Sequence, residues 1–178
     1  MWCARAPGPP RPAATLIAAR SGMRLADVYT PDLSISNGSS VALIICTGTA
    51  RLLFLGDAWA EDVVASLKVL QPTAAPIIFD AIKLSHHGSL HNTSMDLLST
   101  ADSPRFLISS DGSRHGHPDF EVLAEIVDRP AQFERQLFFN YETAATRQLK
   151  SHASRSGMAF SVHVVENDWL QVRGKNYD

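Results

Sequence analysis

The chain has 178 residues, of which 45% are hydrophobic and 19% charged, and its formal net charge is −2. This length predicts one domain with a sizeable core, and the charge gives no general attraction to nucleic acids or anionic membranes. The longest apolar runs, such as residues 41–46, are far shorter than the roughly 20 residues that cross a bilayer. The two cysteines, Cys3 and Cys46, form no disulfide framework. We therefore expect a reduced, cytoplasmic protein without a membrane anchor.

Residues 1–12 differ in composition from the rest, because they contain four prolines and a glycine. We interpret them as a disordered or non-native leader. The apolar residues 13–19 only reach the lower limit of a signal-peptide core before Arg20 ends the run. The predicted domain therefore covers residues 13–178, and no export signal is indicated.

The first part of the domain has β-like patterns. We predict a hairpin of residues 15–18 and 23–29, a polar connection at 31–40, and a second hairpin of core strands at 41–46 and 51–55. Cys46 lies in one of these apolar strands, so we expect it to be a buried small hydrophobe. A helix is predicted next, since apolar residues recur at helical spacing until Pro72: Trp59, Val63, Val64, Leu67 and Leu70.

Strands and helices alternate after this point. We predict a strand at 77–84, a short helix capped by Asn92 or Thr93, a strand at 106–109, a helix at 119–127 with Pro118 in its first turn, strands at 137–141 and 159–165, and a weaker one at 169–173. Residues 143–157 are polar and are predicted to form a mobile loop. Such alternation favours a layered α/β fold with helices covering a sheet.

Asp57 follows a run of apolar residues in LFLGDA at residues 53–58. A carboxylate at a strand end is a hard oxygen ligand for a binuclear Zn, Mn or Fe centre. The alternative is that Asp57 caps the helix that follows.

Two adjacent histidines, His86 and His87, follow the next apolar strand in LSHHGS at residues 84–89. Neutral imidazole is the commonest protein ligand for borderline divalent metals. Neighbouring side chains on an extended segment point in opposite directions, so we expect one ligand and one group that contacts substrate or transfers a proton. The alternative is a histidine pair on a surface loop.

A third motif, RHGHP at residues 114–118, lies between a strand and a helix. His117 is placed to hold an anionic group such as phosphate near the helix start. A His-x-His pair, here His115 and His117, can also chelate one metal ion. The alternative is a polar loop in which Pro118 begins the helix.

The succession of these motifs resembles the C-terminal half of metallo-β-lactamase-fold metallo-hydrolases, and most of all the branch whose domain occurs in DNA-internalisation competence proteins. The matching segments, spread over roughly residues 13–170, are NGSS at 37–40, FLGDA at 54–58, FDAIKLSHHGS at 79–89, NTS at 92–94, ISS at 108–110 and GHP at 116–118. The resemblance implies an αββα sandwich with two zinc ions, or Mn or Fe, at the sheet edge. It implies Asp57 and His86 (or His87) as metal ligands, and His87 and His117 as catalytic groups.

The family's His-x-His-x-Asp-His motif is absent from this sequence. The resemblance therefore implies that the N-terminal half of the sandwich is missing and that the metal site is incomplete, because a catalytic zinc needs about three protein ligands. The leading hypothesis is a hydrolase-like protein for phosphoesters or nucleic acids with weak or no activity. The alternatives are a binding or regulatory module, completed by a second copy or another chain, and a metal-independent α/β enzyme.

Overall fold

The computed structural model describes residues 22–72, 74–165, 169–172 and 174. Its strands are β1 (Leu43–Cys46), β2 (Arg51–Phe54), β3 (Ile77–Ile78), β4 (Ala81–Lys83), β5 (Ala101–Asp102), β6 (Arg105–Ile108), β7 (Arg135–Phe139) and β8 (Phe160–Val164). Its helices are α2 (Leu25–Val28), α3 (Ile35–Gly38), α4 (Ala60–Leu70), α5 (Met95–Thr100), α6 (Phe120–Asp128) and α7 (Ala144–Lys150), with a 3-10 turn η1 (Ser85–Gly88). The class is mixed α/β, as the alternating pattern predicts.

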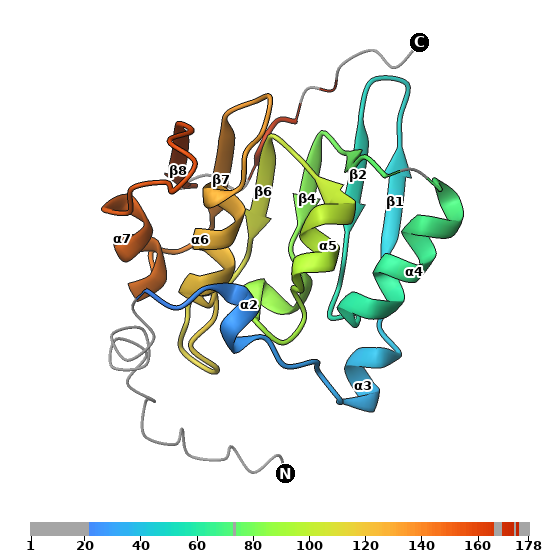
Figure 1. Ribbon diagram of the computed structural model, residues 1–178, viewed down its shortest axis with the longest axis horizontal. Helices are drawn as coiled ribbons and strands as arrows, with labels where there is room; N and C mark the ends of the chain where they lie inside the picture. The colour runs from blue at the N-terminus through green and yellow to red at the C-terminus, as the bar shows by residue number, and fades with distance from the viewer. Residues whose placement is uncertain (1–21, 73, 166–168, 173, 175–178) are drawn as a thin grey trace.

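Six strands form one sheet in the order β1-β2-β4-β6-β7-β8, and β3 pairs with β5 in a separate two-stranded sheet. Only β1 runs antiparallel to its neighbour, and the other five strands are parallel. These five strands follow one another across the sheet in chain order. Right-handed crossovers in one direction place all connecting helices on the same face, and Figure 1 shows α4, α5, α6 and α7 in front of the sheet.

The core lies between this sheet and its helices. Leu53, Ile82, Phe106 and Leu137 align across four neighbouring strands and are at most 2% exposed. Helix α6 contributes the largest share from the helical layer, since all nine of its residues are buried. The apolar strand residues thus predicted the core correctly, because parallel strands bury apolar side chains against their crossover helices.

The opposite face of the sheet carries another aligned row, which consists of Leu43, Phe54, Lys83, Leu107, Phe138 and His163. Among the described residues no helix or second sheet packs on this face. Leu43 is 51% exposed and Ile45, two residues further along β1, is 42% exposed. Parallel sheets are almost always covered on both faces, so this half-open apolar face is an exception among α/β folds.

The second hairpin, the helix at α4 and the strands at β6, β7 and β8 agree with the sequence predictions to within a few residues. The predicted strand at 77–84 is divided between β3 and β4, which belong to different sheets. The short helix α5 is capped by Ser94, whose hydroxyl accepts from the Leu97 amide, and not by Asn92 or Thr93. Pro118 precedes Asp119, the N-cap of α6, and so lies outside the helix.

Other predictions were wrong as well. The segment 23–29 contains α2 and not a strand, because Asp27 bonds back to the Arg24 amide and closes a helical turn. The predicted loop 143–157 contains α7, where Thr143 accepts from the Thr146 amide and Leu149 is fully buried. Cys46 is exposed, because β1 is an edge strand.

Residues 169–172 form no strand. The predicted leader at 1–12, Cys3 and the predicted strand at 15–18 lie outside the described residues. None of the helices in the described ranges is long and apolar enough to cross a bilayer.

Candidate functional site

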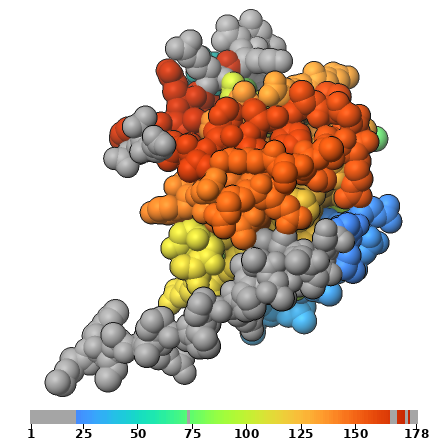
Figure 2. All heavy atoms as spheres, turned by 90° about the vertical axis from the view of Figure 1, so that its left-hand side faces the viewer, coloured from blue at the N-terminus to red at the C-terminus, as the bar shows by residue number. Residues whose placement is uncertain are grey.

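The three motifs meet at one edge of the large sheet. Asp57 follows β2, the histidine pair follows β4, and the loop of residues 109–118 follows β6. Because β2, β4 and β6 are parallel neighbours, their carboxyl ends lie side by side, which is where open α/β sheets bind ligands. This edge is the lower one in Figure 1, and in Figure 2 the yellow atoms near residue 110 project below the orange layer of α7.

Two hydrogen bonds hold the backbone of Asp57, and its side chain does not cap α4. Its amide donates to the Ser40 hydroxyl at 2.9 Å, and its carbonyl accepts from the Asn92 side chain at 3.2 Å. Trp59 occupies the N-cap of α4 and makes no side-chain capping bond. The carboxylate of Asp57 instead lines a cavity with the histidines. The structure therefore contradicts the alternative that Asp57 caps α4.

The backbone of the histidine pair adopts a conformation that L-residues rarely take. His86 has φ 42° and His87 has φ 60°, and Gly88 follows with φ 83°. A left-handed conformation costs a non-glycine residue about 1–2 kcal/mol. The His86 amide donates to the Gly56 carbonyl at 2.8 Å, so the turn after β4 is bonded to the turn after β2. Strain of this kind clusters at functional sites.

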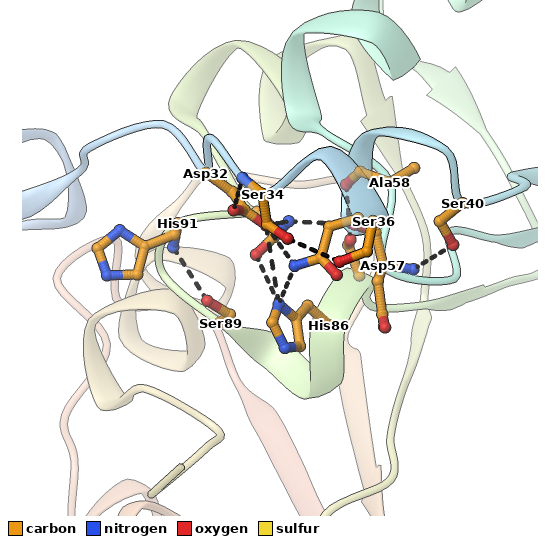
Figure 3. Close-up of polar contacts among 12 residues, drawn as sticks. Asp32, Ser34, Ser36, Ser40, Asp57, Ala58, His86, Ser89 and His91 are labelled. Carbon is orange, nitrogen blue, oxygen red and sulfur yellow. Dashed lines mark hydrogen bonds and ion pairs between the residues drawn. The ribbon is translucent and has the colours of Figure 1, made fainter.

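His86 is oriented by a polar network that Figure 3 displays. Its Nδ1 lies 3.0 Å from Asn92 Oδ1 and 3.3 Å from Asn37 Nδ2. Both amides donate to Asp32 Oδ2, at 2.9 Å from Asn92 and 2.6 Å from Asn37. Of these two neighbours only Asn92 Oδ1 is an acceptor, and it is the nearer one. We therefore assign the proton to Nδ1 and the lone pair to Nε2. Figure 3 shows the second ring nitrogen facing away from this network.

Asp32 is the fixed charge of this network. Burial alone would raise the pKa of its carboxyl, but bonds from Asn37, the Ser34 amide and Asn92 outweigh burial and hold this pKa below the ordinary value. Asp32 therefore stays ionised and fixes the two amides that contact His86. Sequence reasoning missed Asp32 because it lies in a polar segment, and no sequence signal marks a residue that acts through two amides from other segments.

The other two predicted histidines are anchored in the same way. His87 Nδ1 makes a short bond to the Ser109 carbonyl, and His117 Nδ1 lies 3.1 Å from Asp119 Oδ2. Both partners accept a proton, so both rings present an unprotonated Nε2 when neutral. Asp119 also accepts from the Leu90 amide at 2.9 Å, which ties the β6–α6 loop to the turn after β4. An imidazole whose Nδ1–H is held by an oxygen is the usual form of a metal-ligating histidine.

All four predicted site residues line one open cavity of about 450 Å³. Its wall is completed by His115 and by polar residues of the β6–α6 loop, which are Ser109, Ser110, Asp111, Ser113 and Arg114. Lys83 lies close enough to Asp57 for their charges to interact, although burial lowers the pKa of its ammonium group. The histidine loops and the strand-end aspartate are thus brought together.

Within the described ranges no three His, Cys, Asp or Glu side chains are already placed to hold a metal ion together. The donor chemistry nevertheless fits a borderline divalent cation, since imidazole nitrogens and one carboxylate face the same cavity. Sequence and structure comparisons give no independent assignment: no family model, no curated protein and no solved structure matches this chain.

Proposed function

We propose that the cavity is the active site of a metal-dependent hydrolase that cleaves phosphoesters or nucleic-acid-type bonds. The observation that carries this proposal is the convergence of Asp57, His86, His87 and His117 from three strand ends on one cavity. We also propose that the described layer of helices and sheet is one half of an αββα sandwich of the metallo-β-lactamase type. The uncovered apolar face of the parallel sheet supports this second point.

In this proposal Asp57 and His86 hold zinc, or manganese or iron. A bound cation of this kind lowers the pKa of a coordinated water toward 7 and so supplies a nucleophile. Asn92 and Asp32 keep Nε2 of His86 unprotonated and aimed into the cavity. Asp119 orients the ring of His117 through its Nδ1, and in this proposal His117 donates a proton to a leaving oxygen. His87 is held by the Ser109 carbonyl and, in this proposal, contacts the substrate.

Zinc binding is the first test of this function. The purified chain, equilibrated with Zn²⁺ and then desalted, is expected to retain near-stoichiometric zinc by elemental analysis. Asp57→Ala and His86→Ala are expected to lose it, whereas His163→Ala, on the far strand β8, is expected to keep it. With bis(4-nitrophenyl) phosphate as substrate, we expect slow zinc-dependent hydrolysis that is lost in both site variants. Zinc-free protein, or hydrolysis that survives exhaustive chelation, would contradict the proposal.

A second candidate function is a binding module, and the half-open sheet face favours it. An apolar surface of this kind on a parallel sheet is a docking site for another β layer. We expect concentration-dependent self-association in sedimentation experiments, which Leu43→Lys weakens by about tenfold, or roughly 1.4 kcal/mol. Leu33→Lys is the matched control, because Leu33 is 83% exposed and lies outside the sheet. A monomer at every concentration would exclude self-association as the role of this face.

A further inference from the structure

The rings of His86, His115 and His117 form a triangle in this cavity, and the proposed Asp57 and His86 pair uses only its His86 corner. The ring centroids of His86 and His117 are 5.3 Å apart, those of His115 and His117 are 6.0 Å apart, and those of His86 and His115 are 6.5 Å apart. Two imidazoles bound to one tetrahedral zinc, at about 2.0–2.1 Å from each nitrogen, have centroids about 5 Å apart. One side of the triangle already has this length, and the two sides that end at His115 are about 1 to 1.5 Å longer.

Hydrogen bonds hold His86 and His117, and each of these rings has the tautomer that metal binding requires. His86 donates through Nδ1 to Asn92, which Asp32 holds, and His117 donates through Nδ1 to Asp119. The ring of His117 is therefore bonded to a carboxylate, and that of His86 is linked to one through the Asn92 amide. Both rings keep an unprotonated Nε2. Carboxylate–histidine pairs of this kind orient the ring and raise the basicity of the ligating nitrogen.

The third corner, His115, lies on the glycine-containing loop between β6 and α6. His115 is exposed and lies between Gly112 and Gly116, which have φ values of 72° and 78°. His115 and His117 form a His-x-His pair on a single loop, in which His117 is anchored by Asp119 and His115 lies nearer the loop centre. Asp57 and Asp111 line the same cavity and favour a cation, which offsets the unfavourable charge of Arg114.

We propose that His86, His115 and His117 together bind one borderline divalent cation, with the fourth position left to water or to a substrate oxygen. This inference deepens the proposed function and rests on it for any catalytic role. It makes His117 a ligand in place of a proton donor, and the cation site itself does not require Asp57. Three protein ligands and one open position are the composition of a catalytic zinc site. The chain would then supply a complete ligand set without a His-x-His-x-Asp-His motif.

Cobalt(II) is the probe of choice, because its visible absorption reports tetrahedral nitrogen coordination as well as affinity. Titration of the unaltered chain is expected to give one tetrahedral Co²⁺ that Zn²⁺ displaces. His115→Ala and His117→Ala are each expected to weaken binding by about 100-fold, and Asp119→Asn by about 10-fold. His163→Ala is the control: it removes an imidazole on β8, outside the cavity lining, so binding is expected to change less than about threefold.

The outcomes separate this inference from the proposed function. Loss of Co²⁺ in His115→Ala with retention in Asp57→Ala supports the three-histidine site and leaves Asp57 out of it. Loss in Asp57→Ala and His86→Ala with retention in His115→Ala overturns the inference and supports the simpler ligand pair. Absence of a tetrahedral spectrum in the unaltered chain overturns the inference as well. Imidazole proton resonances of the unaltered chain, followed by NMR during Zn²⁺ addition, give a readout that does not depend on any variant folding.

Discussion

Replacement of Arg135 by methionine is expected to lower the free energy of unfolding by about 3–5 kcal/mol. The guanidinium group is 2% exposed and forms a two-pronged bond with Asp102, at 2.6 Å from Nη2 to Oδ2 and 3.1 Å from Nε to Oδ1. It also donates to the Arg129 carbonyl at 2.6 Å. Removing it leaves a buried carboxylate whose remaining contacts are the Ser103 amide at 2.8 Å and the longer 3.4 Å ion pair with Arg129. An uncompensated buried charge costs far more than the pair contributes.

Urea unfolding of the single and double variants measures this effect. Arg135→Met combined with Asp102→Leu is expected to recover roughly half of the lost stability, because the buried carboxylate is removed as well. Recovery is incomplete because Arg129 then loses its 3.4 Å ion pair with Asp102. Arg147→Ala is the surface control, since its ion pair with Glu142 is 3.8 Å long and both side chains are largely exposed; its expected effect is below about 1 kcal/mol. A loss below about 1 kcal/mol in Arg135→Met would show that water reaches Asp102.

The second large effect is expected at Gly88, where the two histidine loops touch. Its φ of 83° is unfavourable for any side chain, and a Cβ there would lie 2.9 Å from Cβ of Pro118. The Gly88 carbonyl also accepts from the Asp119 amide at 3.0 Å. Gly88→Ala is expected to cost about 1–2 kcal/mol for the backbone and about 1–3 kcal/mol for the forced contact. The displaced loop should also weaken Zn²⁺ binding by about 10-fold or more.

Gly157 provides a matched control for this variant. Its φ is 71°, but no atom lies within 4 Å of the position that a Cβ would take. Gly157→Ala therefore carries only the backbone cost of about 1–2 kcal/mol and should leave metal binding unchanged. Thermal unfolding and zinc titration of both variants test the comparison. Equal stability losses in the two variants would mean that the loop containing Pro118 accommodates the added Cβ at no cost in free energy.

The sequence predicted the elements whose burial depends on local pattern. Helical spacing of apolar residues identified α4, and apolar runs identified β2, β6 and β7, because each of these segments buries apolar side chains in the core. The sequence-based predictions failed where a segment is short or mainly polar. Helix α7 buries few residues and is defined by the Thr143 cap, and α2 is a single turn. Cys46 was misjudged because an apolar strand at the sheet edge has the same composition as one at the centre.

The candidate site shows the same division. By itself the sequence determined which chemical groups are present and that each follows an apolar strand: the aspartate of LFLGDA, the histidines of LSHHGS and those of RHGHP. Only the tertiary structure decided that they share one cavity, because parallel pairing of β2, β4 and β6 brings three strand ends together. It also decided how the histidine pair is held, since His87 bonds to the Ser109 carbonyl and Asn92, the partner of His86, is fixed by Asp32. Hydrogen-bond partners distant in sequence are chosen by the packing of the whole chain, and no local pattern of residues encodes them.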